Sequence, residues 1–303
     1  MLKTNQFRNY TTIISLLLLF TLVRLEASAQ LFNLNQLELI ARDFSFTEGP
    51  AVDRQGNIYF TDQPNNKIWK YSTQGKLTLF KANAGRANGL YFDRNNNLLA
   101  CADENNEIWS INRNGKIKVV LSKFEGKRLN GPNDLWVDQH GGIYFTDPYY
   151  QRDYWLWKKP EIKEQRVYYL APKQTKPIIV ANDLVKPNGI IGSADGKYLF
   201  VADIEQDKTY KYRIGNNGEL KDKQLLINKG SDGMTLDAQG NIYLTGNGVF
   251  IYSPQGILIQ HIKINEPWTA NVCFGGKDRA TLFITASTAI YKLPMLRSAS
   301  SGQ

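Results

Sequence analysis

The sequence contains few of the residues that cross-link small proteins or form common catalytic sites. Cys101 and Cys273 are the only cysteines among 303 residues, and His140 and His261 are the only histidines. Two cysteines cannot form a disulfide framework, and the repeats described below put them in units that are not neighbours, so two unpaired thiols are expected. Scarce histidine argues against a His-rich zinc site. The G-x-S-x-G motif of Ser-His-Asp hydrolases is also absent.

Long apolar runs are absent except near the N-terminus. The basic residues Lys3 and Arg8 precede an apolar run from Thr11 to Val23, and the small residues Ala27-Ser28-Ala29 follow it. This order is typical of a secretory signal peptide, so residues 1–29 are predicted to direct export to the periplasm or the medium and to be cleaved. The run is shorter than the roughly 20 apolar residues of a membrane span, although an uncleaved anchor stays open.

The chain is basic but has no basic patch. Its formal net charge is +9, and no basic run is longer than Lys158-Lys159. Scattered lysines do not predict nucleic-acid binding, so no nucleic-acid partner is expected, and no stable membrane insertion is expected after signal cleavage. The length fits one domain over residues 30–303, as a monomer or dimer.

One line of sequence recurs about every 40–50 residues. It begins with Asp and Gly, which favour tight turns, and continues with β-branched and aromatic residues, which favour a buried strand. Each copy therefore predicts a β-hairpin, and such a period is typical of propellers or solenoids. The copies span residues 53–62, 93–103, 138–147, 195–203 and 237–245, with a degenerate sixth from 275 to 285.

Two more strands follow most hairpins. Ile68–Tyr71 is an example of the third strand and Leu77–Phe80 of the fourth. Four short strands per repeat make a propeller blade, so six copies predict an all-β, six-bladed β-propeller with four-stranded antiparallel blades. The sixth repeat stops after its third strand, and Leu37–Ile40 is expected to supply the outer strand and close the ring.

An oxygen-bearing side chain recurs near the start of each first strand, about five residues before the turn. First strands line the channel of a propeller, so these side chains are expected to converge at one depth. Six carboxylate or amide groups form a poor apolar core but a good site for Ca²⁺, which takes 6–8 oxygen ligands. The alternative is that they only bond turn backbone. The six are Glu48, Asn88, Asn133, Asn188, Asp232 and Asn271.

Other acids and an insertion border this ring. Asp134 follows Asn133 directly and is a candidate to orient water or substrate. The acids that end the second strands, Asp62, Asp103, Asp147 and Asp203, are expected to bond turn amides or an adjacent blade. An aromatic and basic insertion over residues 148–159 separates the third and fourth repeats. It is interpreted either as part of a binding mouth or as a loop that packs its aromatics on the propeller.

From Phe46 to Leu293 the chain resembles the gluconolactonase family, which includes the regucalcin-like senescence-marker lactonases. The matching motifs are Glu48-Gly-Pro, Arg128-Leu-Asn-Gly-Pro-Asn-Asp134, Tyr144-Phe-Thr-Asp-Pro148, Pro187-Asn-Gly189, Ser231-Asp-Gly-Met234 and Asn271-Val-Cys-Phe-Gly-Gly276. The resemblance implies a six-bladed propeller with one divalent ion in its channel.

The resemblance also implies roles for individual residues. Glu48, Asn188 and Asp232 correspond to metal ligands, and Asn133 to a residue that contacts metal or substrate. Asn88 and Asn271, added from the repeat alignment, are expected to support these ligands from behind. Mammalian-type members carry an arginine where this chain has Gly131. The nearest arginine is Arg128, which is a candidate substrate-binding residue with Asn133 and Asp134.

Together these features predict a metal-dependent carboxylic-ester hydrolase that opens a small, sugar-type lactone. Ca²⁺ is the expected ion, with Mg²⁺, Zn²⁺ or Mn²⁺ as alternatives. A cation polarises a carbonyl and activates water, and Asp232 is predicted to act as the catalytic base. The alternatives are an arylesterase or phosphotriesterase at the same site, or a non-catalytic propeller that Ca²⁺ stabilises and that binds a ligand.

Overall fold

The computed structural model describes residues 30–296, and the predicted signal peptide lies outside this range. Within these residues the only helix is a single 3₁₀ turn, η1 (Leu34–Gln36), and everything else regular is strand. No helix of the described chain is long and apolar enough to pass through a bilayer. The export prediction stays a prediction.

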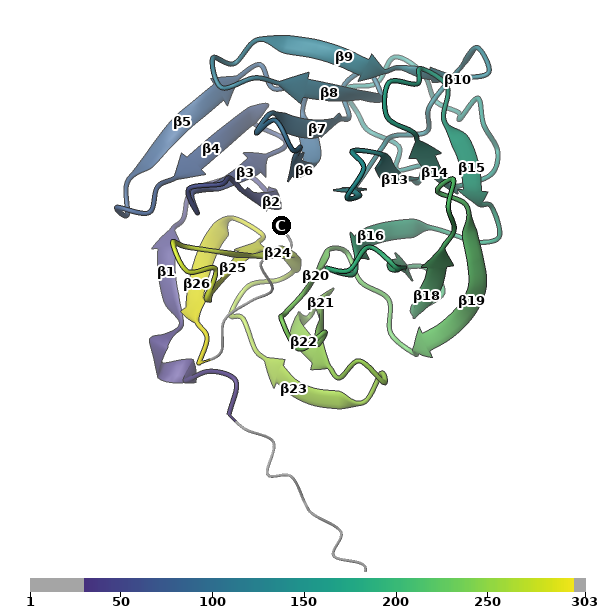
Figure 1. Ribbon diagram of the computed structural model, residues 1–303. Coiled ribbons are helices and arrows are strands. Elements are labelled where there is room, and N and C mark those ends of the chain that lie inside the picture. The colour runs from purple at the N-terminus through teal and green to yellow at the C-terminus, as the bar shows by residue number, and fades with distance from the viewer. Residues whose placement is uncertain (1–29, 297–303) are drawn as a thin grey trace, which may run out of the picture.

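Four-stranded antiparallel sheets follow one another around a central axis (Figure 1). Blade one is β2 (Thr47–Val52), β3 (Ile58–Asp62), β4 (Lys67–Tyr71) and β5 (Leu77–Ala82). Blade two is β6 (Ala87–Phe92), β7 (Leu98–Ala102), β8 (Glu107–Ile111) and β9 (Ile117–Leu121). Blade three is β12 (Leu135–Val137), β13 (Ile143–Asp147), β14 (Arg166–Leu170) and β15 (Ile178–Ala181).

The remaining blades repeat this order. Blade four is β16 (Pro187–Gly192), β17 (Tyr198–Asp203), β18 (Lys208–Ile214) and β19 (Leu220–Ile227). Blade five is β20 (Met234–Leu236), β21 (Ile242–Gly246), β22 (Gly248–Tyr252) and β23 (Leu258–Ile262). Blade six is β24 (Thr269–Gly275), β25 (Thr281–Ala286), β26 (Ala289–Pro294) and β1 (Glu38–Ala41). A small hairpin, β10 (Lys123–Phe124) and β11 (Lys127–Arg128), lies between blades two and three. The predicted six-bladed all-β propeller is confirmed.

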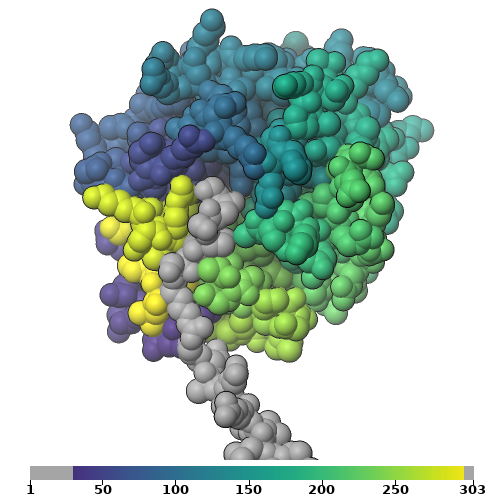
Figure 2. All heavy atoms as spheres, viewed as in Figure 1, coloured from purple at the N-terminus to yellow at the C-terminus, as the bar shows by residue number. Residues whose placement is uncertain are grey.

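The two ends of the described chain meet in blade six. β1, which overlaps the predicted outer strand Leu37–Ile40, pairs antiparallel with β26, with Glu38 opposite Lys292. Figure 2 shows the purple N-terminal residues beside the yellow C-terminal strands. One residue pair, Gly246 and Thr269, also joins blade five to blade six. The last blade is therefore held by both ends of the described sequence.

Turn chemistry fixes each hairpin, and the core fills the space between blades. The Oδ1 atom of Asp53 accepts the backbone N–H groups of Gln55 and Asn57 at 3.0 and 2.9 Å, and equivalent aspartates repeat this bond. Apolar side chains of neighbouring sheets interlock, for example those of blades three and four. Cys101 and Cys273 are both free, as predicted. Both are also buried, and burial raises the pKa of both thiols.

The inner strands of neighbouring blades approach each other at glycines. A Cβ atom at Gly49 would overlap the carbonyl oxygen of Asn88, and one at Gly89 would lie 2.5 Å from the carbonyl oxygen of Asn133. The Gly89 N–H donates to that same oxygen at 2.8 Å. The hydroxyl of Thr61 also reaches across, to the Asn88 carbonyl at 3.1 Å. Only glycine allows this distance between the blades.

We expect Gly49→Ala to destabilise the propeller by at least about 2 kcal/mol more than Gly115→Ala, because overpacking against backbone costs about 1–3 kcal/mol or more. Both glycines have positive φ, but nothing lies within 4 Å of a Cβ atom at Gly115. The comparison thus separates the clash from the loss of backbone freedom. Urea unfolding of the two variants measures it, and equal destabilisation would show that the close approach is unimportant.

Candidate active site

A cavity of about 490 Å³ opens where the inner strands begin. Five of the six predicted channel residues line it. Glu48, Asn88 and Asn188 come from β2, β6 and β16, whereas Asn133 and Asp232 come from the residues just before β12 and β20. The sequence repeat therefore brought together side chains that lie up to 184 positions apart. Ser231 to Gly233 are fixed by the hydroxyl of Thr245, which donates to Gly233 O at 2.9 Å.

Two carboxylates, those of Glu48 and Asp232, line this cavity. Glu48 is buried, with 3% of its surface exposed. Burial first, and then the charge of Asp232, hold the pKa of Glu48 well above its usual range. Burial likewise raises the pKa of Asp232. The two acids therefore disfavour each other's ionised forms, and a cation between them would relieve that repulsion.

The hydrogen bonds of Asp232 fix its orientation. Its Oδ1 accepts Nδ2 of Asn188 at 2.9 Å, and its Oδ2 accepts the indole N–H of Trp268 at 2.6 Å. The same Asn188 Nδ2 also donates to the hydroxyl of Tyr150 at 3.0 Å. Because Nδ2 of Asn188 donates to both Asp232 and Tyr150, the amide oxygen of Asn188 points away from these two partners.

Unpartnered oxygens in the cavity fit a hard cation. The Oδ1 atoms of Asn88 and Asn188 are buried and accept no hydrogen bond. A buried acceptor without a donor is costly, so such atoms indicate a missing partner. Residues 30–296 contain no cluster of three or more His, Cys, Asp or Glu side chains suited to a metal. Two carboxylates with amide oxygens instead form a donor set of the kind that Ca²⁺ prefers.

Asp134 and Asn271 do not line the cavity. Asp134 Oδ1 accepts the N–H of Leu135 at 2.9 Å, and its Oδ2 accepts Nδ2 of Asn271 at 3.3 Å. Burial raises the pKa of Asp134 to about 7. The supporting role of Asn271 and direct substrate contact by Asp134 both stay predictions.

The structure does not bring Arg128 to the cavity. Arg128 lies on β11, where its Nη1 pairs with Glu161 at 3.2 Å and its guanidinium stacks 3.8 Å from the centre of the Trp157 ring. Above Gly131 the space is taken by Trp155, whose ring would lie 3.2 Å from a Cβ atom there. Arg152 is instead the arginine that lines the cavity.

The insertion over residues 148–159 lies inside blade three, between β13 and β14, and not between blades three and four as expected. It both packs its aromatic side chains and lines the cavity, so each of its two interpretations holds for part of it. Trp155 is buried and stacks on Trp157, with ring centres 5.2 Å apart. Tyr150 and Arg152 face the cavity. The sequence indicates this segment as a candidate for the binding site but does not single out Tyr150 or Arg152. It gives no signal for Trp268, which lies outside the repeated sequence motif.

The aspartates that end the second strands form hydrogen bonds that hold nearby loops in place. Asp62, Asp147 and Asp203 accept backbone N–H groups of the segment before their own first strand, as expected. Asp103 instead binds the adjacent blade. Its carboxylate accepts Nε of Arg152 at 3.0 Å and the hydroxyl of Tyr154, and its carbonyl accepts the indole N–H of Trp155 at 2.7 Å.

We expect Asp103→Ala to loosen the insertion, since Arg152 loses its ion pair and Tyr154 its acceptor. Trypsin should then cut after Arg152 or Lys158 at least about tenfold faster, because local opening exposes these bonds. Glu104→Ala is the control, since this neighbouring acid is exposed and lies 3.9 Å from Arg86. Mass spectrometry of the fragments measures both rates. Equal rates in the two variants would mean that Asp103 does not anchor the segment.

Comparison with known proteins finds relatives in sequence and in fold. The sequence model of one family, described as SMP-30/Gluconolactonase/LRE-like region, matches residues 46–288. A gluconolactonase from Zymomonas mobilis is 29% identical over 291 residues, which cover 85% of this chain and 80% of that protein.

Solved structures agree with the fold. The gluconolactonase XC5397 from Xanthomonas campestris superposes with a TM-score of 0.80 at 25% identity, covering 86% of this chain and 89% of that one. A regucalcin from Agrobacterium tumefaciens, described as a calcium-binding protein, has a TM-score of 0.71 at 18% identity, covering 88% and 96%. The second likeness concerns the fold alone.

Proposed function

Because the chain belongs to the SMP-30/Gluconolactonase/LRE-like family, we propose that it hydrolyses a small lactone in the cavity of about 490 Å³. The observation that supports this most is the joint presence of two repelling carboxylates and two buried amide oxygens without donors. The volume suits one small ring, since small-molecule sites usually measure about 300–1,000 Å³.

In this proposal Glu48, Asn133, Asn188 and Asp232 hold one divalent cation, with Ca²⁺ preferred over Mg²⁺, Zn²⁺ and Mn²⁺. When bound, the cation would supply Lewis-acid polarisation of the lactone carbonyl and lower the pKa of a nearby water. Asn88 completes the oxygen surface beside these four residues. Asn271 is proposed to support this site, and its Nδ2 donates to Asp134, the candidate for orienting water or substrate.

Asp232 is the proposed general base. Water attacks the carbonyl carbon while a proton passes from that water to the Asp232 carboxylate, and the proton then moves to the ring oxygen as the C–O bond breaks. The bonds from Asn188 and Trp268 hold the carboxylate in one orientation during this transfer. General-base catalysis of this kind contributes about 10²–10⁴-fold.

We expect glucono-1,5-lactone or a small aliphatic lactone to be hydrolysed, with activity lost in EDTA and restored by a divalent cation. Glu48→Gln should abolish the metal-dependent rate, and Asp232→Asn should lower it by about 10²-fold or more. The measurement is proton release in weak buffer at fixed pH. Glu205→Gln, a change in an exposed acid that pairs with Lys186, is the control.

Three results would contradict this assignment. Tight cation binding without turnover of any lactone or ester would favour a binding propeller. Faster turnover of aryl esters or phosphotriesters than of lactones would favour the esterase alternative. Full turnover and metal binding by Asp232→Asn would exclude this residue as the base.

We further propose that Arg152, rather than Arg128, contacts the substrate, because only Arg152 lines the cavity. Its guanidinium could donate to the hydroxyl or carbonyl oxygens of a lactone. Arg152→Gln should lower kcat/KM about tenfold, whereas Arg128→Gln should leave it nearly unchanged. Steady-state kinetics compares the matched pair, and the opposite ranking would restore Arg128 as the substrate-binding arginine.

A further inference from the structure

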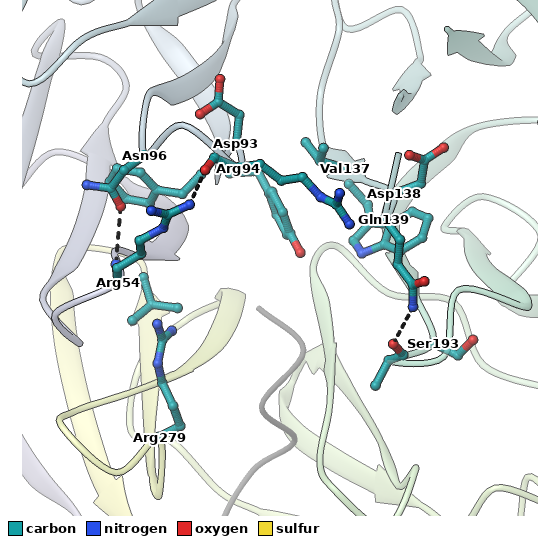
Figure 3. A pocket seen from close by; sticks show the side chains of 14 residues that line it. Arg54, Asp93, Arg94, Asn96, Val137, Asp138, Gln139, Ser193 and Arg279 are labelled. Atoms are coloured by element: carbon teal, nitrogen blue, oxygen red, sulfur yellow. Dashed lines mark hydrogen bonds between the residues drawn. The ribbon is translucent and has the colours of Figure 1, made fainter. Parts of the chain in front are cut away.

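A second cavity lies at the opposite ends of the same inner strands (Figure 3). Its volume is about 350 Å³, and it shares no lining residue with the candidate active site. Val52, Phe92 and Val137 line it and are the last residues of β2, β6 and β12. Each of these strands has a residue of the candidate active site at or just before its start. The channel thus has two separate mouths. One is lined by carboxylate and amide oxygens, and the other is lined by arginines.

Three arginines from three blades line this second mouth. Arg54 and Arg94 follow the inner strands of blades one and two, and Arg279 comes from blade six. Figure 3 shows the side chain of Arg94 pointing across the cavity toward the turn that carries Gln139, with Arg54 and Arg279 on the side of blades one and six.

These arginines lack carboxylate partners. Six of the ten arginines in residues 30–296 form salt bridges. Three of the four that do not are the ones in this cavity, and the fourth, Arg113, lies in an exposed outer turn. Unpaired guanidinium groups are therefore concentrated at this mouth.

Each guanidinium also keeps donors free. Arg54 donates to the carbonyl of Arg94, and Arg279 Nη2 donates to the carbonyl of Asp53 at 2.7 Å. The Nη1 atom of Arg279 is buried and has no hydrogen-bond partner, and burial lowers the pKa of this residue. A guanidinium carries five N–H donors, so one or two carbonyl contacts leave most of them unused.

The two acids that line the cavity are held by their own turns. Asp93 Oδ1 accepts two backbone N–H groups, at 2.8 and 2.7 Å. Asp138 accepts the N–H of Gly142 at 2.8 Å and the hydroxyl of Tyr169 at 2.8 Å. Among the lining residues, three guanidinium groups therefore face two engaged carboxylates. The buried Asp53 carboxylate also acts on Arg279, but its Oδ1 and Oδ2 accept bonds from its own turn. Tyr91 and Trp136 add an aromatic wall.

We infer that the second mouth of the channel binds a small oxyanion, a carboxylate or a phosphate group, between Arg94, Arg279 and Arg54. Guanidinium recognises both groups through paired N–H donors, and such charge-assisted bonds are stronger than neutral ones. The aromatic wall and the volume suit an organic acid or organic phosphate rather than a macromolecule. This inference does not depend on lactone hydrolysis, because no residue is shared.

The test is calorimetric titration of the full chain with inorganic phosphate and, separately, with succinate, at constant ionic strength. Arg94→Gln is the main variant, since the Arg94 side chain forms no ion pair with residues 30–296 and its loss should not disturb folding. Arg113→Gln is the matched control, because among residues 30–296 Arg113 is the one unpaired arginine outside the cavity. We expect saturable binding of at least one anion, weakened about tenfold or more by Arg94→Gln and unchanged by Arg113→Gln.

Binding of phosphate alone would identify a phosphate site, and binding of succinate alone a carboxylate site. The inference is wrong if neither anion binds saturably, if Arg94→Gln leaves the affinity unchanged, or if both variants weaken it equally. Lactone turnover should be the same in all three proteins, so failure of the oxyanion site and failure of the proposed activity can be told apart.

Discussion

The close approach of neighbouring inner strands is the constraint on which the rest of the molecule depends. At Gly49 and Gly89 the backbone of the next blade occupies the place of a side chain. Glu48 and Asn88 directly precede these glycines, so both are carried to the channel at the same depth. The same dipeptide pattern recurs at Asn188-Gly189 and Asp232-Gly233. A propeller with larger residues at these positions would have to widen its ring and separate its polar side chains.

This crowding sets the electrostatics of the candidate active site. Glu48 is buried and Asp232 lines the same cavity, so burial and the charge of Asp232 both raise the pKa of Glu48. A single blade could not create this effect, because each supplies only one of the two charges. The packed sheets keep the acids together at a free-energy cost that cation binding would offset.

The sequence repeats predict the features that every blade shares, but they do not predict site residues that occur at a single position in the chain. Six blades and the ring of polar residues follow from a repeated line, because equivalent positions in a propeller share a depth. Arg152 and Trp268 stand outside that line, and their places depend on contacts with Asp103 and Asp232 that no local pattern encodes. Nearness in sequence to Gly131 makes Arg128 a candidate, but Trp157 and Glu161 hold it away from the cavity.

The two mouths of the channel are built from the same strands and differ in charge. From Glu48 to Arg54 the chain advances six residues, or roughly 20 Å in extended form. Salt screens exposed charges over about 8–10 Å but screens a buried charge such as that of Glu48 much less. An anion at Arg94 would therefore act on the cation site through a direct Coulomb interaction that distance weakens more than salt does. Any stronger coupling between the mouths would have to pass through the packed inner strands, which meet at the glycine contacts.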